Sequence, residues 1–201
     1  MSWMEIVSAV LGLSCVFLAG RNRKSNFWVG YVYNIFLFLL FWRQHLYSAM
    51  TLQLISFGIN LFGHWRWTHP REDERSAADE KALKVKSLTS SQLSFILLAV
   101  CAFGAILAGA MEKLPEKWPD VFQPDPSPRL DAFILAFTLL AQYLSAQKCW
   151  ECWIVWIGVN VANIILYITA GLYIMPLVSV LYLGNAVWSL VSWRKFYRNN
   201  E

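Results

Sequence analysis

The sequence contains little charge for its length. Aspartate, glutamate, lysine and arginine make up 15% of the 201 residues, whereas soluble globular domains carry roughly 25%. Hydrophobic residues reach 57%, above the roughly 45–50% of soluble domains, and the mean hydropathy is +0.42. This balance argues against a soluble domain, excludes disorder over most of the chain, and favours an integral membrane protein.

Cysteine and histidine are also scarce, which limits the chemistry that the chain supports. Four cysteines, three of them inside apolar runs, exclude a secreted disulfide scaffold. The pair Cys149-x-x-Cys152 allows a redox or metal site, but two small packing residues explain it as well, since no second pair and no histidine lie nearby. His45, His64 and His69 are too dispersed for a metal cluster. Phosphate-binding glycine loops, nucleophile elbows and HExxH motifs do not occur, so we expect no enzyme activity, no metal and no cofactor.

Long apolar runs dominate the chain. Seven of them approach the length of about 20 residues that a helix needs to cross a bilayer. They cover residues 3–20, 26–44, 48–67, 90–110, 130–147, 150–169 and 172–193. Two polar stretches interrupt them: a charged connector at 69–89, expected to be solvated and partly helical, and a proline-rich outer loop at 111–129 that cannot form a continuous helix. The sequence thus predicts an all-α integral membrane protein with seven transmembrane helices.

The 17 lysines and arginines are distributed unevenly between the two sides of the predicted membrane. Seven spans place the termini on opposite sides, and the side with the C-terminus holds 13 of the 17. Basic residues accumulate in cytoplasmic loops, so this side faces the cytoplasm and the N-terminus faces outward. No basic segment precedes the first apolar run, and a cleaved signal peptide is not expected. We predict a multi-pass protein of the bacterial inner (cell) membrane, and because topology accounts for the basic residues, no nucleic-acid partner.

The chain matches itself at an offset of 126 residues, without a gap, from Leu18 to Trp67. The informative matches are Asn34 with Asn160, Tyr47 with Tyr173, Gly58 with Gly184 and Trp67 with Trp193. Residues 1–68 and 130–201 are therefore predicted to be two copies of a three-helix unit, the second with a cytoplasmic tail, and 90–110 a linker helix between them. Since one helix separates them, the copies run parallel, as in transporters that bind substrate between two halves. Chance similarity between apolar helices is the alternative.

Polar and aromatic side chains follow one face of several spans. Spacings of 3, 4, 3 and 4 residues place Trp153, Trp156, Asn160, Asn163 and Tyr167 on one helical face. Span 48–67 has a comparable face with Gln53, Ser56, Asn60, His64 and Trp67, and span 130–147 adds Thr138, Gln142 and Ser145. Amides are costly in hydrocarbon unless they are paired, so these faces are expected to point inward. The alternatives are hydrogen bonding between helices, an interfacial position for the tryptophans, and simple packing for His64.

Together these faces would enclose a pocket with flat aromatic walls and neutral hydrogen-bonding groups. The predicted binding residues are Gln53, Asn60, His64, Gln142, Trp153, Trp156, Asn160, Asn163 and Tyr167. An indole face attracts a cation by about 0.5–2 kcal/mol, so the pocket suits a planar, polar or cationic ring. The acids near the spans, Glu5, Asp131 and Glu151, all lie close to span ends, and no chain of buried acids indicates a proton relay. Nothing in the sequence requires coupling to an ion gradient.

These residues resemble the PnuC-type vitamin transporter family. The resemblance rests on Glu151-x-Trp153-x-x-Trp156-x-x-x-Asn160, on Gln123-Pro124-Asp125 ahead of the fifth span, and on Leu52-Gln53 followed by Asn60-x-x-Gly63 and Trp67. It implies a SWEET-like fold of 3+1+3 helices, facilitated diffusion of nicotinamide riboside with trapping by a cytoplasmic kinase, and a homotrimer. By the same resemblance, Trp153, Trp156 and Asn160 would bind the substrate, with Gln53 and Asn60 facing them. Related members carry thiamine or riboflavin.

Two departures from the family pattern keep a second substrate open. The third span ends in Gly63-His64-Trp65-Arg66-Trp67, where the family often has Gly-Trp-Tyr-x-Trp, and Trp188 stands where some nicotinamide riboside members have an asparagine. Thiamine, which is also a flat cation with a hydroxyl, would fit an aromatic cage. A membrane thiol oxidoreductase using Cys149 and Cys152 is the hypothesis from a different class. Changing both cysteines to serine would abolish that activity and leave transport intact.

Overall fold

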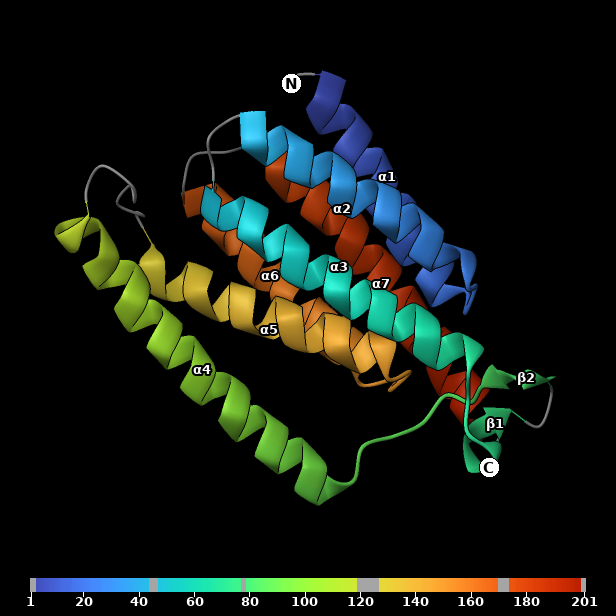
Figure 1. The fold of residues 1–201 in the computed structure, drawn as a ribbon. Coiled ribbons are helices and arrows are strands. Elements are labelled where there is room, and N and C mark those ends of the chain that lie inside the picture. The colour runs from blue at the N-terminus through green and yellow to red at the C-terminus, as the bar shows by residue number, and fades with distance from the viewer. Residues whose placement is uncertain (1–2, 44–46, 77–78, 119–126, 170–173, 200–201) are drawn as a thin grey trace.

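The computed structural model describes residues 3–43, 47–76, 79–118, 127–169 and 174–199. Within these ranges the chain is almost entirely helical (Figure 1). The helices are α1 (Trp3–Gly20), α2 (Ser25–Arg43), α3 (Tyr47–Thr68), α4 (Ser90–Lys117), α5 (Pro128–Ala146), α6 (Cys152–Thr169) and α7 (Ile174–Arg198). Between α3 and α4 lie a short 3-10 turn (Glu72–Glu74) and two antiparallel strands, β1 (Arg75–Ser76) and β2 (Asp79–Leu83). We call the end of the bundle that carries these strands the hairpin end.

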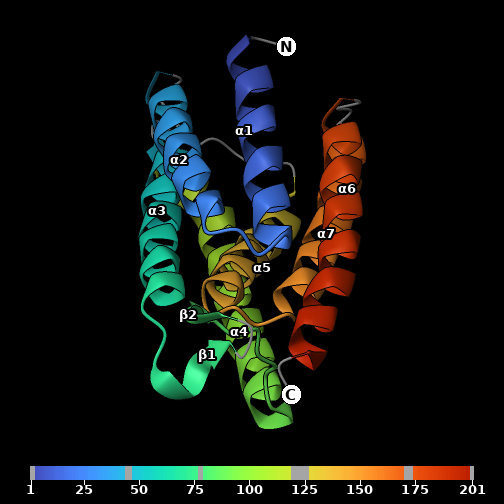
Figure 2. The ribbon, with the colours of Figure 1, turned by 90° about the vertical axis from the view of Figure 1, so that its right-hand side faces the viewer.

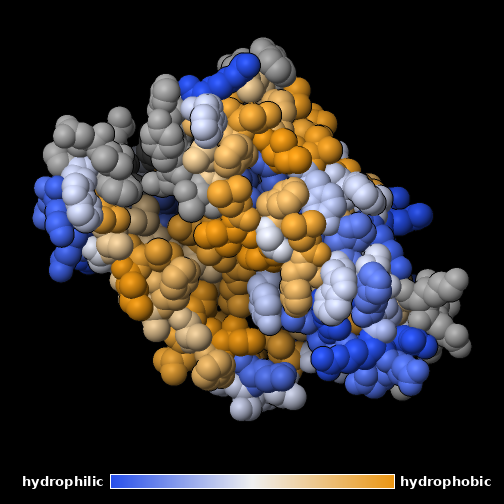
Figure 3. Space-filling model, in the orientation of Figure 1, coloured by the Kyte–Doolittle hydropathy of each residue, from blue (hydrophilic) through white to orange (hydrophobic). Residues whose placement is uncertain are grey.

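Apolar side chains cover much of the outside of the bundle. Five helices of the described part, α2 and α4–α7, are long and apolar enough to cross a membrane, and α1 adds a shorter apolar stretch, Ile6–Gly20. On α4, Phe95, Leu98 and Ile106 each expose 70% or more of their surface. Figure 3 shows a broad hydrophobic zone between hydrophilic side chains at the hairpin end and others at the opposite side of the view. Large exposed apolar areas of this kind are what a lipid-embedded protein presents.

Two groups of three helices form the bundle. Helix α2 packs between α1 and α3, and α6 packs between α5 and α7. The groups meet along two seams, one between α1 and α7 and the other between α3 and α5. Helix α4 lies against α5 at the outside, and the hairpin closes one end of the molecule (Figures 1 and 2).

Equivalent tryptophans tie the two seams together near the hairpin end. The Trp193 indole N–H donates to the Ala19 carbonyl oxygen at 3.2 Å, and the Trp67 indole N–H donates to the Ser145 carbonyl oxygen at 3.3 Å. Both the donors and the acceptors lie 126 residues apart in the sequence. Each group of helices therefore hydrogen-bonds to the other through the same type of contact.

Aromatic stacking follows the same correspondence. Phe17 stacks on Trp188 in the α1–α7 seam, with ring centroids 6.0 Å apart, and Tyr143 stacks on Phe62 in the α3–α5 seam at 6.3 Å. Positions 17 and 143, and positions 62 and 188, again differ by 126. The two seams are thus built from corresponding rings.

Small residues let the helices approach in both seams. A Cβ on Gly20 would collide with the Ser189 hydroxyl, and one on Gly63 would lie 3.0 Å from the Cβ of Ala146. Position 20 corresponds to 146, and 63 to 189, so each seam pairs a glycine with a serine or an alanine. Close helix approach through small residues is typical of packing in membranes.

The α1–α2 and α5–α6 turns have the same backbone form. Asn22 and Lys148, again 126 residues apart, are the non-glycine residues with positive φ in the described chain, at 58° and 60°. The amide N–H of each bonds to the carbonyl oxygen three residues earlier, at 2.9 Å and 3.0 Å. Asparagine tolerates this left-handed conformation well and lysine does so less readily.

The charged connector differs from the expectation of a solvated, partly helical segment. Strands β1 and β2 pair here, and the side chains of Leu83 and Val85 are only 1% and 3% exposed. They belong to the same buried cluster as Trp67 and Trp193. Alternate residues of an extended segment point to opposite sides, so two apolar residues spaced by two reach the core while their charged neighbours stay outside.

The predicted linker helix 90–110 begins where expected and ends later. Thr89 and Gln92 form a capping box, which fixes the start of α4 at Ser90. Helix α4 then continues through Pro115 to Lys117, into the segment expected to be an irregular loop. A proline so close to the C-terminal end breaks only one intrahelical hydrogen bond before the helix stops. Residues 119–126 of that loop lie outside the described ranges, and α5 starts at Pro128, a position that favours proline.

Candidate functional site

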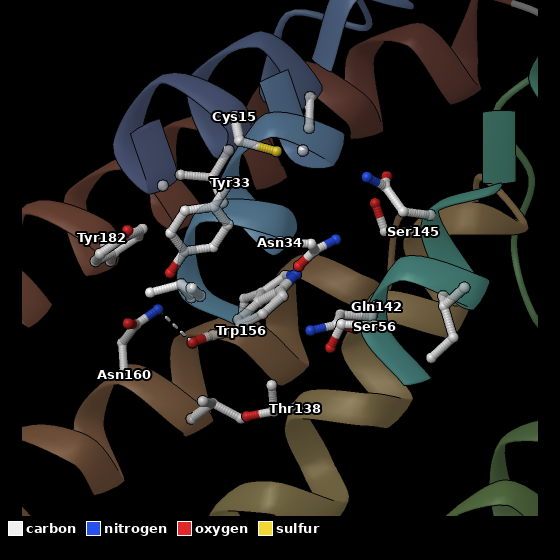
Figure 4. A pocket seen from close by; sticks show the side chains of 18 of the residues that line it. Cys15, Tyr33, Asn34, Ser56, Thr138, Gln142, Ser145, Trp156, Asn160 and Tyr182 are labelled. Atoms are coloured by element: carbon white, nitrogen blue, oxygen red, sulfur yellow. Dashed lines mark hydrogen bonds between the residues drawn. The ribbon is translucent and has the colours of Figure 1, made fainter. Parts of the chain in front are cut away.

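A cavity of about 390 Å³ lies between the two groups of helices. Its volume falls within the roughly 300–1,000 Å³ of small-molecule sites. All the bundle helices except α4 contribute to its wall (Figure 4). The lining starts near the hairpin end at Ala19, Ser145 and Trp153 and extends to Leu52 and Met175, which lie in the opposite halves of their helices. The cavity therefore follows the long axis of the bundle.

Eight of the nine predicted binding residues line this cavity. They are Gln53, Asn60, Gln142, Trp153, Trp156, Asn160, Asn163 and Tyr167. Ser56, Thr138 and Ser145, which share the predicted polar faces, line it as well. Residues that helical spacing places on the polar faces of α3, α5 and α6 therefore line one cavity.

His64 is the predicted residue that the cavity wall does not include. Its Nδ1 lies 2.8 Å from the Tyr31 hydroxyl, its ring stacks on Phe27 at 5.2 Å, and Trp28 packs edge-on against it. The aromatic residues of α2 thus occupy the space beside this side of α3. The sequence left a binding role and a packing role open for His64, and these contacts fit the packing role.

Further polar residues of the wall come from α2 and α7, where the sequence shows no continuous polar face. Asn26 and Asn34 of α2 are 4% and 7% exposed, and both line the cavity with Tyr33. Ser179 and Tyr182 of α7 do the same. The offset of 126 residues offered a signal for three of them, since it matches Asn34 with Asn160, Gln53 with Ser179 and Ser56 with Tyr182. Figure 4 labels Asn34, Tyr33 and Trp156 among the residues that line the cavity.

Two indoles form the aromatic wall. Trp153 is 1% exposed and packs edge-to-face against Trp193, with centroids 5.4 Å apart, and its buried N–H has no hydrogen-bond partner among the described residues. Trp156 is half-buried and borders the cavity one helical turn further along α6. Trp150, by contrast, lies outside the cavity, where the Arg194 guanidinium sits 4.9 Å from its ring centroid.

The two sides of the cavity differ where the sequence repeat would make them equal. Gly30 of α2 stands at the position that corresponds to Trp156, and a Cβ on Gly30 would collide with the amide nitrogen of Asn60. The position that corresponds to Asn60 holds Ala186, which is buried. One group of helices therefore presents an amide where the other presents an indole, and the cavity suits a ligand with an aromatic end and a hydroxyl-rich end.

The carboxamides of the wall keep hydrogen-bonding capacity for a ligand. Asn160 donates through Nδ2 to the Trp156 carbonyl oxygen at 2.8 Å (Figure 4), and Asn60 donates through Nδ2 to the Phe27 carbonyl oxygen at 3.4 Å. Within the described residues these contacts use one N–H of each amide. The carboxamide oxygens remain as acceptors.

Charge is excluded from the cavity wall. None of the described residues that line it is a lysine, arginine, aspartate or glutamate. Glu151, the acid of the sequence motif, is 6% exposed and lies outside, where its Oε1 accepts hydrogen bonds from the Ser87 hydroxyl and the Leu88 amide. The described wall is thus neutral, with aromatic faces and, as polar groups, amides, hydroxyls and the Cys15 thiol.

The thiols of Cys149 and Cys152 are packing groups in this fold. They are 1% and 0% exposed and belong to the core cluster with Trp67 and Trp193. Burial raises the pKa of the Cys149 thiol to about 12, so almost none of the reactive thiolate forms at neutral pH.

A helical bundle with an apolar outside and a neutral, amide-lined cavity along its axis has the build of a membrane transporter. The family model described as nicotinamide mononucleotide transporter matches residues 2–195, and the chain belongs to this family. The PnuC-type family predicted from the sequence motifs is thereby confirmed.

Curated relatives of this chain are transporters. The nicotinamide riboside transporter PnuC of Escherichia coli (strain K12) is 26% identical over 199 residues, which cover 88% of this chain and 79% of that protein. The riboflavin/roseoflavin transporter RibM of Streptomyces davaonensis is 26% identical over 191 residues, covering 95% and 84%. A crystal structure of the vitamin B3 transporter PnuC has the same fold, with a TM-score of 0.73 at 23% identity, covering 100% of this chain and 84% of that one. The chain is a transporter and not an enzyme.

Proposed function

We propose that this protein carries nicotinamide riboside across the membrane. The observation that carries the proposal is the neutral cavity that Trp153 and Trp156 of α6 line together with the amides of Asn34, Gln53 and Asn60 from α2 and α3. Nicotinamide riboside joins a flat pyridinium cation and a carboxamide to a ribose. The indoles offer cation–π contact to the ring, and the amides offer partners to the carboxamide and the ribose hydroxyls.

The absence of charge favours the nucleoside over its phosphate ester. A nucleotide would place a phosphate dianion in a cavity whose described lining holds no lysine or arginine. An anion buried without a positive partner is strongly disfavoured. The family description mentions the mononucleotide, whereas the E. coli relative is named for the riboside, and the chemistry of the wall agrees with the latter.

His64 and Trp188, the two departures from the family pattern, are not among the described residues of the cavity wall. Trp188 stacks on Phe17 in the α1–α7 seam, and His64 packs on Phe27. These two positions were one part of the argument for thiamine; the other part, that a flat cation with a hydroxyl fits an aromatic cage, applies to this cavity as well. Riboflavin, which the RibM relative is named for, is a neutral three-ring system and gains less from the indole faces.

We infer a uniport mechanism in which substrate moves down its own gradient and is trapped by phosphorylation in the cytoplasm. Coupling to protons or sodium requires a group that binds the ion, and the described wall offers no carboxylate. The basic loops and the C-terminal tail lie at the hairpin end. This end would face the cytoplasm, and the N-terminus would face outward.

We also infer that residues 1–68 and 130–201 are repeats in a SWEET-like 3+1+3 arrangement, with α4 as the linker helix. The supporting observations are the seam contacts and turns whose partners lie 126 residues apart. A homotrimer remains a prediction from the resemblance, and the mass of the protein in detergent tests it.

Ligand titration tests the substrate. The purified protein is titrated with nicotinamide riboside, nicotinamide mononucleotide, thiamine and riboflavin while the quenching of its own tryptophan fluorescence is followed. We expect nicotinamide riboside to bind tightest and the mononucleotide to bind at least about a hundredfold more weakly, as expected for an unpaired buried charge. If thiamine or riboflavin binds more tightly, the proposed substrate is wrong, but the assignment of the cavity as the binding site stands. Equal binding of the mononucleotide would contradict the neutral-wall argument.

A further inference from the structure

Connector residues close the hairpin end of the bundle through an ionic contact with α3. Arg66, in the last turn of α3, donates to both carboxylate oxygens of Glu74 at 2.7 and 2.8 Å. Lys86 approaches the same carboxylate at 3.3 Å. A paired guanidinium and carboxylate is among the strongest polar contacts that a protein makes. Glu74 therefore fastens the connector to the first group of helices.

A second fastening comes from the α5–α6 turn. The Lys148 ammonium group donates to the Leu83 carbonyl oxygen and lies 4.6 Å from the ring centroid of Trp67, and this lysine is only 2% exposed. Position 148 has a left-handed backbone, and the corresponding position of the α1–α2 turn holds Asn22, which suits that backbone better. Lysine is less favourable than asparagine in this turn. What Lys148 offers and Asn22 does not is a side chain long enough to contact the connector.

The connector also pairs with this turn along its backbone. The Lys86 N–H donates to the Lys148 carbonyl oxygen, and the Trp150 N–H donates to the Lys86 carbonyl oxygen, both at 3.1 Å. Two residues further on, the Leu88 N–H donates to Glu151 at 2.8 Å. The connector is thus held by α3 on one side and by the α5–α6 turn on the other, so it bridges the two groups of helices.

The residues under this bridge pack against one residue of the cavity wall, Trp153. Trp67 and Trp193, one from each group, contact each other with centroids 5.8 Å apart, and Trp193 packs on the cavity residue Trp153. Leu83 and Val85 of the connector join the same cluster. A substrate that leaves through the hairpin end must separate the two tryptophans and displace the strand that covers them.

We propose that Glu74 and residues 83–88 of the connector form a latch that holds the inner exit of the transporter closed. The proposal rests on the transport function and orientation proposed above. A latch has to release without unfolding the protein. The side chains of Arg66 and Glu74 are 10% and 16% exposed, so water reaches both groups once the connector moves away and replaces the lost partners. Release of the latch takes Leu83 and Val85 out of the buried cluster and precedes the separation of Trp67 and Trp193.

Cys149 serves as a built-in reporter of the latch. It is 1% exposed, lies in the same cluster as Leu83 and Val85, and precedes Trp150, whose amide pairs with the connector. The test uses a variant that keeps Cys149 alone, with Cys15, Cys101 and Cys152 changed to alanine. A membrane-impermeant maleimide is added to the protein in detergent, and the labelling rate of the thiol is measured. Glu74→Gln and Lys148→Asn are compared with Glu72→Gln, a control at an exposed residue of the same segment.

We expect both latch variants to label about tenfold faster or more, as the loss of a charged hydrogen bond predicts, and the control to label at the parent rate. Cys152, which is 0% exposed and begins α6, reports unfolding when it is the only cysteine, and its labelling is expected to stay slow in the same variants. Unchanged labelling of Cys149, or equal acceleration at Cys149 and Cys152, would overturn the latch. The labelling needs no substrate, so a failure of the substrate proposal would appear separately in the titrations.

Discussion

At the scale of single residues, Trp156 and Trp150 provide a matched test of the aromatic wall. Both are tryptophans near the start of α6, but Trp156 borders the cavity and Trp150 packs against Arg194 outside it. Trp156→Ala removes stacking and cation–π contact and is expected to cost on the order of 1–2 kcal/mol, or about tenfold in affinity. Trp150→Ala is expected to leave affinity near the parent value. Calorimetric titration measures both, and equal losses would show that the assignment of the wall is wrong.

Asn160 and Asn34 test the amides at equivalent positions of the two groups of helices. Asn160→Leu removes a carboxamide that lines the cavity. The hydrogen bond described for this carboxamide is with the Trp156 carbonyl oxygen of its own helix. We expect a loss of roughly 1–3 kcal/mol in binding free energy, because a ligand hydroxyl or amide is left without a partner, and little change in melting temperature. Asn34→Leu is the matched variant. If the amides instead hold helices together, melting temperature falls and affinity follows only the folded fraction.

At the scale of elements, Glu74 links the hairpin to α3 in a pH-dependent way. Its pKa is lowered from 4.5 to about 2, mainly by the hydrogen bond from Arg66. A carboxylate with a depressed pKa in the folded state stabilises the protein above its unfolded pKa and loses this contribution as the pH falls from about 4.5 toward about 2. Glu74→Gln is therefore expected to reduce stability at pH 7 by about 1–3 kcal/mol.

Melting temperatures between pH 7 and pH 3 check this expectation. The difference between the parent protein and Glu74→Gln should narrow as the pH falls below about 4.5. Glu112→Gln is the matched control, since Glu112 forms the exposed ion pair with Arg129, whose side chain is 80% exposed, and exposed pairs contribute little. If the difference in melting temperature stays the same at all pH values, the ion pair is not the cause of the lower stability of Glu74→Gln.

The two seams predict paired effects of tryptophan substitution. Trp67→Phe removes an indole N–H that bonds to the Ser145 carbonyl oxygen, and Trp193→Phe removes one that is shared between the Ala19 and Gly20 carbonyl oxygens. Because the contacts correspond, both variants are expected to lower stability by a similar amount, about 0.5–1.5 kcal/mol. Melting temperatures of the two purified variants measure this. A large effect of one and none of the other would argue against equivalent seams.

At the scale of the whole molecule, the neutral cavity predicts transport driven by substrate alone. Purified protein in liposomes is expected to equilibrate nicotinamide riboside across the membrane at a rate set by its own gradient. Imposed proton or sodium gradients should not change the final distribution, because the described cavity wall has no carboxylate to bind the ion. Accumulation above equilibrium in the absence of a trapping enzyme would contradict the uniport mechanism.

The sequence by itself determined the helices, their polar faces and the family. Hydropathy and helical spacing are local properties, so the sequence alone predicts that Gln53, Trp156 and Asn160 lie on inward faces. The membrane environment strengthens this inference, because an amide that faced the lipid hydrocarbon would have no hydrogen-bond partner. The motif around Glu151 and Asn160 added the family, which the comparisons confirm.

The tertiary structure alone decided which neighbours each face meets. Asn26 and Tyr33 line the cavity because α2 turns these isolated polar residues toward it, and His64 does not because Phe27 and Trp28 occupy its side of α3. The connector is the clearest case. A charged segment reads as solvated, yet Leu83 is buried because Trp67 and Trp193, 126 residues apart, meet beneath it. Burial of this kind depends on distant contacts, which no local pattern of residues contains.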